Sequence, residues 1–104
     1  LAEFNTAVRN DCSIVALIGN DYRWNAEVQI QIDSFGADRV YGCELDATAN
    51  YADAAAGLGV HAATVGADDD LDAALAMALA QDGPACLNIL IDSYAAPKFV
   101  PLKL

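Results

Sequence analysis

The sequence has little positive charge. Five Lys and Arg residues stand against fifteen Asp and Glu residues, which gives a formal net charge of −10 over 104 residues. Nucleic acids and anionic membranes are bound through clustered Lys and Arg, so this balance argues against both as partners. The apolar runs are also short, well below the roughly 20 residues that a membrane-spanning helix needs. We therefore expect no nucleic acid and no membrane among the partners.

Cysteine and histidine are scarce as well. Cys12, Cys43 and Cys86 are odd in number, lie far apart and form no CxxC pair. Zinc sites and disulfide frameworks need closer or even-numbered sets, so neither is expected. We expect three small, buried hydrophobic thiols in a reducing, cytoplasmic setting. The single histidine, His61, has no nucleophile or carboxylate at a defined spacing, and a structural role is expected for it.

What is present predicts an α/β chain. The 56% hydrophobic content excludes a disordered chain, and the length suits one modest domain. Phe4, Ala7 and Val8 fall on one helical face, with no capping residue before them. We therefore expect a helix already under way at residue 3, and a chain that is a piece of a longer protein.

Further elements follow from apolar patterns and their flanking turns. Three apolar segments predict strands, over residues 13–18, 60–65 and 86–91, and the first is apolar on both faces, as in a buried parallel sheet. A short helix is predicted over residues 51–58, with Asn50 as N-cap and Gly59 as a left-handed C-cap. A second predicted helix has an inward face that consists of Leu71, Ala74, Leu75, Ala78 and Leu79. Strand, helix and strand in this order indicate a parallel sheet.

One polar turn follows a predicted buried strand. Ligands of open parallel sheets bind beyond the carboxyl ends of the strands, and residues 19–25 follow the first of them. Asn20 and Asp21 carry oxygen atoms of the hard type that Mg²⁺ prefers. Asn and Asp are also common turn residues, and the spacing alone favours an ordinary surface turn.

Several segments of the sequence together carry a resemblance to a known family. They are the helix end Thr6-Ala7-Val8-Arg9, the strand over 14–18, the turn Asn20-Asp21-Tyr22-Arg23-Trp24, the stretch 51–59, and Gly83-Pro84-Ala85-Cys86 before the last strand. In this order and spacing, residues 3–91 resemble the end of the diphosphate-binding domain of thiamine-diphosphate-dependent enzymes. This family includes acetolactate synthases, benzaldehyde lyase and 2-oxo-acid decarboxylases. The resemblance implies a flavodoxin- or Rossmann-like three-layer α/β sandwich with a parallel sheet, here incomplete.

The resemblance also implies a cofactor site. In the family, a metal ion joins the cofactor diphosphate to an upstream Gly-Asp-Gly motif, to an Asn-Asn turn and to a backbone carbonyl two residues further on. By position, the metal ligands fall on the side chain of Asp21 and the carbonyl of Arg23. Asn20 matches the first Asn, and Trp24 matches a position near the reaction centre. Asp21 departs from the family pattern by adding a negative charge where a neutral amide is usual.

Other parts of the family site have no counterpart in this sequence. The Gly-Asp-Gly motif and the catalytic Glu are absent, so no catalytic residue is assigned and the chain alone is expected to be inactive. The implied partners are the remainder of the same enzyme, a homodimer or homotetramer, and a 2-keto acid substrate. The implied cofactors are thiamine diphosphate and Mg²⁺, and because only some relatives also bind FAD, the resemblance leaves FAD open. We expect residues 1–92 to belong to the cofactor-binding domain and 93–104 to form an extended tail.

The resemblance changes the expectation for one segment. Val28, Ile30 and Ile32 alternate with polar residues, which by itself predicts a strand. In the family this segment forms a helix that covers the cofactor, so residues 26–34 are expected to be helical. Residues 36–49 show no clear period, and mostly loop is expected there.

The remaining polar residues are given structural roles. Asp68, Asp69, Asp70 and Asp72 lack the pattern of a calcium loop and are expected to cap the helix that follows. Glu27 and Glu44 are expected on the surface, and Asn88 is expected to bond to neighbouring backbone.

Two further functions compete with the enzyme hypothesis. A non-catalytic α/β module that docks to another chain is suggested by the open sheet and by the apolar end of the chain, residues 99–104. A flavodoxin-like nucleotide binder ranks last, because no Gly-rich phosphate loop is present.

Overall fold

The computed structural model describes residues 1–93 of the chain. They fall into two compact units, one formed by residues 1–20 and 48–91, the other by residues 21–47 and the segment that starts at residue 92. The predicted tail over 93–104 lies, apart from Ser93, outside the described residues. Each unit is considered by itself below.

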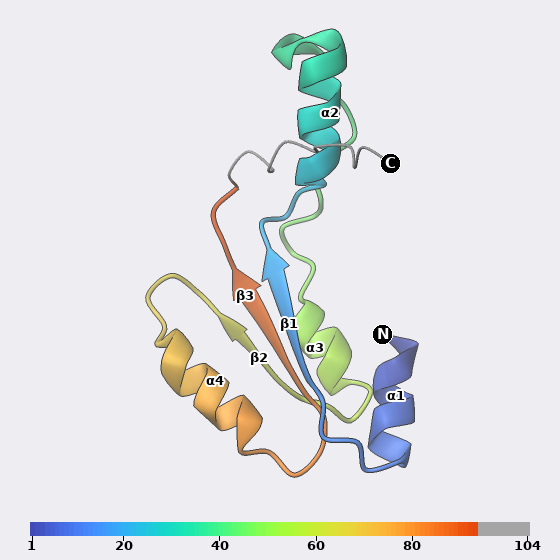
Figure 1. The fold of residues 1–104 in the computed structure, drawn as a ribbon, viewed down its shortest axis with the longest axis vertical. Helices are drawn as coiled ribbons and strands as arrows, with labels where there is room; N and C mark the ends of the chain where they lie inside the picture. The colour runs from blue at the N-terminus through green and yellow to red at the C-terminus, as the bar shows by residue number, and fades with distance from the viewer. Residues whose placement is uncertain (94–104) are drawn as a thin grey trace, which may run out of the picture. The chain divides into compact units, whose positions relative to one another are not determined.

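The first unit contains a parallel sheet. Its strands are β1 (Val15–Asn20), β2 (His61–Val65) and β3 (Ala85–Leu90), in the order β1-β3-β2 (Figure 1). Both outer strands run parallel to β3, and their first residues pair with Ala85. The predicted α/β class with a parallel sheet is therefore confirmed.

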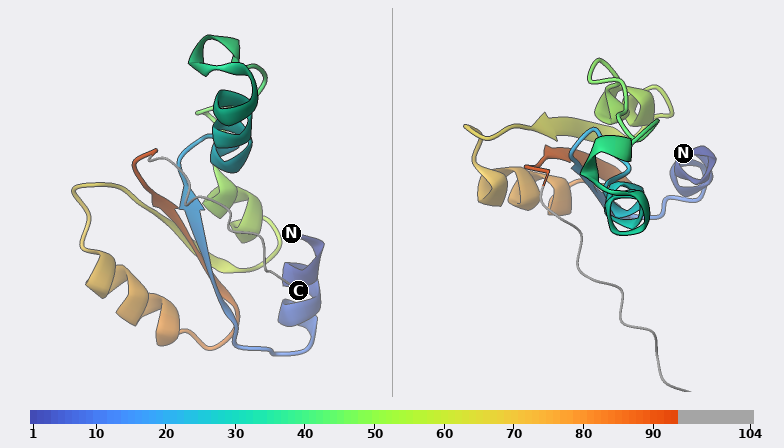
Figure 2. Two further views of the ribbon diagram at one scale, coloured as in Figure 1. Left: turned by 45° about the horizontal axis from the view of Figure 1, so that its top comes forward. Right: turned by 90° about the horizontal axis from the view of Figure 1, so that it is seen from above.

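Helices cover both faces of this sheet (Figure 2). The face packed by α1 (Ala2–Arg9) and α3 (Tyr51–Ala56) is called the α3 face, and its core is Ala55, Val60 and Cys86. The other, the α4 face, is covered by α4 (Leu71–Leu79) and has a core of Val65, Ala78, Ala85 and Leu87. The unit thus has three layers, as an incomplete Rossmann-like domain should.

The predicted start of α3 is confirmed, and its predicted end is wrong. Asn50 is the N-cap, and its side chain accepts hydrogen bonds from the amides of Ala52 and Asp53. The helix ends at Ala56, and its C-cap is Gly57 rather than Gly59. Gly59 does have a positive φ of 87°, but it lies in a tighter turn of i→i+3 hydrogen bonds beyond the helix.

The inward face of α4 is narrower than predicted. Ala74, Leu75 and Ala78 pack on the sheet, whereas Leu71 is 40% exposed and Leu79 is 71% exposed. These two leucines are the first and last residues of the helix, outside the central turns that contact the sheet. The predicted capping by aspartates is confirmed for Asp70, whose side chain accepts the amide of Ala73.

The predicted burial of β1 on both faces is wrong. Within residues 1–93 β1 pairs with β3 alone, which makes it an edge strand. As a result Leu17 is 54% exposed, and Ile14, just before the strand, is 45% exposed. The central strand β3 has the predicted character, since Ala85 to Asn88 are all buried.

The second unit is built on α2 (Asn25–Phe35) and a following 3₁₀ helix, η1 (Ala37–Arg39). The helix that the family resemblance predicts here is thus confirmed. The strand that the alternation of apolar and polar residues predicts is wrong. Val28 and Cys43 are the apolar side chains that this unit buries among its described residues. Apart from η1, the segment 36–47 is loop, as expected.

All three cysteines are free. Cys43 and Cys86 are buried, as predicted, but Cys12 is exposed because it lies in the loop between α1 and β1. Among residues 1–93, no helix combines the length and the hydropathy needed to cross a bilayer.

Candidate functional site

The first predicted site residue, Asn20, ends β1 in the first unit. Its side chain is 4% exposed, and its backbone carbonyl accepts the amide of Ile91 at 3.0 Å. Ala16 and Ile18 pack on the α3 face, so the alternation of a strand puts Asn20 on that face too. Asn20 is therefore a buried polar group at the carboxyl end of an edge strand.

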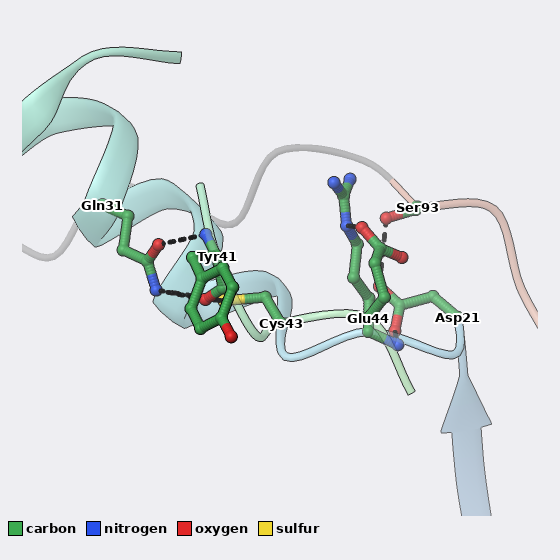
Figure 3. Close-up of polar contacts among 7 residues, drawn as sticks. Asp21, Gln31, Tyr41, Cys43, Glu44 and Ser93 are labelled. Carbon is green, nitrogen blue, oxygen red and sulfur yellow. Dashed lines mark hydrogen bonds and ion pairs between the residues drawn. The ribbon is translucent and has the colours of Figure 1, made fainter. Parts of the chain in front are cut away.

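The other predicted site residues, Asp21, Arg23 and Trp24, belong to the second unit. Asp21 forms a tight turn, in which its Oδ1 accepts the backbone amide of Arg23 at 3.1 Å. Its Oδ2 accepts the hydroxyl of Ser93 at 3.3 Å, and Figure 3 shows Ser93 beside Asp21. Each carboxylate oxygen has two lone-pair sites, so both keep capacity for a cation.

Tyr22 makes this turn possible by an uncommon backbone conformation. Its φ is 54°, a left-handed value that bulky residues seldom adopt. The chain then runs antiparallel to residues 43–45, where the amide of Trp24 donates to Cys43 at 2.8 Å and that of Leu45 donates to Tyr22 at 2.8 Å.

This pairing determines where the carbonyl of Arg23 points. Arg23 and Glu44 form the bridge, but the hydrogen bonds are made by their neighbours in the chain. In such a pair, the N–H and C=O groups of the bridged residue point away from the partner strand, toward one common edge. The N–H of Arg23 meets the Asp21 carboxylate there. The Arg23 carbonyl therefore lies on the same edge as the Asp21 carboxylate.

The side chain of Arg23 is engaged elsewhere. Its Nε donates to Oε1 of Glu44 at 2.7 Å. Glu44 is on the surface, as predicted, so solvent weakens this ion pair. Among residues 1–93, no Lys or Arg forms an ion pair with Asp21. The negative charge of Asp21 is thus uncompensated by a protein cation in the described part of the chain.

Trp24 precedes α2 as its N-cap residue. Its carbonyl accepts the amide of Val28 at 3.0 Å, which closes the first turn of the helix, and the residue is 56% exposed. Trp24 thus offers a large apolar surface directly beyond the turn that holds Asp21 and Arg23.

Sequence reasoning missed a clamp that holds the loop in this unit. The Gln31 side chain accepts the amide of Tyr41 at 2.7 Å and donates to the carbonyl of Tyr41 at 3.1 Å (Figure 3). Its Nε2 also lies 3.2 Å from Sγ of Cys43. Gln31 thus pairs with the loop as a strand would and fixes the segment that leads to residues 43–45. No local spacing signals a contact between residues that are ten positions apart in the sequence.

Asn88 and His61 lie in the first unit. Asn88 donates to the hydroxyl of Thr64 at 3.5 Å, so the predicted bond to backbone is wrong for its side chain. His61 is exposed at the start of β2, beside a cavity of about 240 Å³ between β2 and α4. That is the opposite end of the strand from the one where parallel sheets bind ligands.

The described residues bring few candidate metal-ligating side chains together. Over residues 1–93, no three His, Cys, Asp or Glu side chains stand close enough to hold a metal ion together. Burial raises the pKa of the Cys86 thiol, which keeps it protonated and a poor ligand at neutral pH. A cation on Asp21 would therefore need oxygen atoms from the backbone and from outside the described chain.

Comparison with known protein families gives one match to report. The family described as "Thiamine pyrophosphate enzyme, C-terminal TPP binding domain" matches residues 1–89. This range includes all three strands of the parallel sheet to within one residue of the end of β3, together with the turn at Asn20 and Asp21. The chain therefore belongs to the thiamine pyrophosphate enzymes and represents their C-terminal cofactor-binding domain.

Proposed function

We propose that the chain is the C-terminal segment of an acetolactate-synthase-like enzyme that decarboxylates 2-keto acids or joins the resulting adduct to a second carbonyl compound. Within that enzyme it helps to bind Mg²⁺ and the diphosphate of the cofactor. The observation that carries the proposal is the common edge shared by the Asp21 carboxylate and the Arg23 carbonyl. The family membership supports thiamine diphosphate as the cofactor.

The chemistry of this edge suits Mg²⁺. Both groups are hard oxygen donors, and Mg²⁺ binds proteins through one or two carboxylates together with substrate phosphates. The uncompensated charge of Asp21 attracts a cation, and the cation in turn offsets the repulsion between Asp21 and a diphosphate. Asn20 contributes an uncharged polar group for the diphosphate, and Trp24 offers an apolar surface near the reacting part of the cofactor.

The roles of these residues are binding and orientation. When bound, thiamine diphosphate supplies the carbanion chemistry that a 2-keto acid needs to lose CO₂. Asp21 and the Arg23 carbonyl fix the metal, and the turn at Tyr22 keeps these two ligands on one edge. The remaining ligands and the catalytic acid come from the remainder of the enzyme, as a homodimer or homotetramer. A cytoplasmic location is part of the same proposal, whereas FAD accompanies thiamine diphosphate only in some members of the family.

The test is Asp21→Ala in the full-length protein. We expect the affinity for thiamine diphosphate in the presence of Mg²⁺ to fall by about tenfold or more, as for other lost metal ligands. Without Mg²⁺ the affinity should change little. Isothermal titration calorimetry with and without Mg²⁺ measures both values.

Two matched variants sharpen this test. Asp21→Asn keeps an oxygen donor and should retain most of the Mg²⁺-dependent affinity. Arg23→Ala removes the guanidinium and leaves the carbonyl in place, so it should bind the cofactor as the wild type does. An Asp21→Ala protein with wild-type affinity in Mg²⁺ would refute the proposed metal role.

A second candidate function is docking without catalysis. It is favoured by α4, whose exposed surface includes Met77 and Leu79, 67% and 71% exposed, and whose one charged residue is Asp72. A helix that is apolar nearly all round is usually covered on more than one side. A docking module of this kind would show no stabilisation by the cofactor.

A further inference from the structure

A chain of hydrogen bonds crosses the α3 face of the sheet in the first unit. Asn88 Nδ2 lies 3.5 Å from the Thr64 hydroxyl, which lies 3.2 Å from Asn50 Oδ1. Asn50 Oδ1 also accepts the amides of Ala52 at 3.0 Å and Asp53 at 3.2 Å. The chain therefore ends on an oxygen that receives three donors.

The direction of these bonds follows from that end. Asn50 Oδ1 faces two backbone N–H groups and acts as acceptor, so the hydroxyl proton of Thr64 points to Asn50. The Thr64 oxygen then has only lone pairs left for Asn88, which must turn its NH₂ group toward Thr64. The Oδ1 atom of Asn88 accordingly faces the other way.

That oxygen is a buried acceptor in need of a donor. Asn88 is 1% exposed, and within residues 1–93 its Oδ1 has no hydrogen-bond partner. A buried carbonyl without a donor costs free energy, so such oxygens are nearly always satisfied. Asn88 sits on the central strand, with Thr64 beside it on β2. Its Oδ1 therefore points toward the strand on the other side, β1.

One side chain of β1 on this face can donate. The positions of β1 on the α3 face are Ala16, Ile18 and Asn20, and the first two are apolar. Ile18 pairs directly with Asn88, and Asn20 is the next residue of β1 on the same face. Side chains on such diagonal positions start about 7–8 Å apart, a span that two asparagines cover with one buried water between them.

The geometry points to Asn88 as a positioning residue, whose Oδ1 is joined through one buried water to the Asn20 NH₂ group and so orients the Asn20 carboxamide for the cofactor. The water donates to Asn88 Oδ1, which has no direct partner within residues 1–93, and accepts from the Asn20 NH₂ group. The relay through Thr64 and Asn50 sets the direction of Asn88, and Asn88 sets that of Asn20. A residue that orients a binding side chain in this way influences the affinity of the site without touching the bound molecule. The second half of this inference rests on the proposed role of Asn20 in cofactor binding.

The first experiment does not involve the cofactor. A crystal structure of the full-length, cofactor-free protein should show one conformation for Asn20, with its Nδ2 and Asn88 Oδ1 each within 3.5 Å of one shared water. In Asn88→Leu, which nearly keeps the side-chain volume, the Asn20 amide should take more than one conformation. A single Asn20 conformation without any link to Asn88 would overturn the inference.

The second experiment measures affinity for thiamine diphosphate with Mg²⁺ in a double-mutant cycle. Asn88→Leu should weaken binding about tenfold in the wild-type background. In the Asn20→Ala background it should have no further effect, because Asn88 acts through Asn20. Equal effects in both backgrounds would show that Asn88 does not act through Asn20.

Two further variants separate positioning from general loss of packing. Leu87→Ala empties the α4 face of the same strand, so it should lower the melting temperature and leave cofactor affinity unchanged. Thr64→Val lets Asn88 turn and should weaken cofactor binding less than Asn88→Leu does. Thr64→Val also replaces Asn88→Leu as the test variant if Asn88→Leu fails to fold. If Asn20→Ala binds the cofactor normally while the crystal shows the link, the role of Asn20 in the proposed function fails and the link between the two asparagines stands.

Discussion

At the scale of single residues, Arg23 divides its two polar parts between two tasks. Its side chain pairs with Glu44, while its carbonyl lies on the edge where Asp21 stands. Alanine scanning would register the first task and miss the second, because a substitution leaves the carbonyl unchanged. The sequence could suggest the carbonyl only through the family resemblance, since no side-chain pattern marks a backbone ligand.

The three thiols differ in environment, and we expect them to differ in reactivity. In the native protein at pH 8, iodoacetamide should label the exposed Cys12 first, while the buried Cys43 and Cys86 react only after unfolding. Burial raises the pKa of the Cys86 thiol, which lowers its thiolate fraction further. Mass spectrometry of the labelled peptides over time measures each rate. Labelling of Cys86 as fast as that of Cys12 would contradict this assignment.

The burial of Cys86 also makes the stability of the folded protein depend on pH, with a sign that follows from the direction of the pKa shift. The pKa of Cys86 is higher in the folded protein than its ordinary value of 9.0, so unfolding above that pH releases a proton. The contribution to stability is present below pH 9.0 and is lost as the pH rises toward the folded value. Urea denaturation between pH 8 and 10 should therefore show a steeper loss in the wild type than in Cys86→Ala.

At the scale of secondary-structure elements, local sequence signals predicted where α3 and α4 begin better than they predicted which elements lie next to one another. Asn50 was recognisable as an N-cap, and the aspartates around Asp70 as a capping group, because capping depends on a few consecutive residues. The position of β1 at the edge of the sheet was not, because composition describes a strand and not its neighbours. The same limit explains α2, whose alternating Val28 and Ile30 suggested a strand although the segment folds as a helix.

Asn50→Ala should destabilise the protein by about 1–2 kcal/mol, because it removes an oxygen that accepts two backbone amides and the Thr64 hydroxyl. Asn50→Asp should cost less, since a carboxylate accepts the same three donors. Asp70→Ala, at the start of α4, removes a single bond to Ala73 and is the matched comparison, with an expected cost nearer 1 kcal/mol. Chemical denaturation gives all three free energies of unfolding.

Gln31→Ala should also destabilise, by about 1–2 kcal/mol for two lost hydrogen bonds to the Tyr41 backbone. Gln29→Ala on the same helix is the control, because Gln29 bonds to Asp33 along an exposed face and should cost under about 0.5 kcal/mol. Equal losses in the two variants would mean that the clamp on Tyr41 adds nothing to a surface contact.

At the scale of the whole chain, the charge of −10 over 104 residues shapes what this part of the enzyme can bind. A diphosphate approaches an acidic protein unfavourably unless a cation accompanies it. The proposed function therefore implies that the cofactor and Mg²⁺ stabilise the full-length protein together more than either does alone. The fold class was predictable at this scale, since three apolar strands alternating with helices leave few other arrangements.

Differential scanning calorimetry tests this cooperation. Thiamine diphosphate with Mg²⁺, each at 100 times its dissociation constant, should stabilise the native state by about 2.7 kcal/mol or more. EDTA should reverse most of that gain, and the cofactor without metal should give little. If neither the cofactor nor Mg²⁺ changes the melting temperature, the docking function suggested by α4 would be favoured.

Within residues 1–93 one side of β1 pairs with no other strand, which has a practical consequence for the purified chain. Its peptide groups line one border of the sheet, with Ile14 and Leu17 exposed beside them, and such borders recruit strands from other molecules. Concentrated solutions of residues 1–104 alone are therefore prone to aggregate through intermolecular strand addition. Introducing a lysine at Leu17 would act as a gatekeeper and keep the chain soluble.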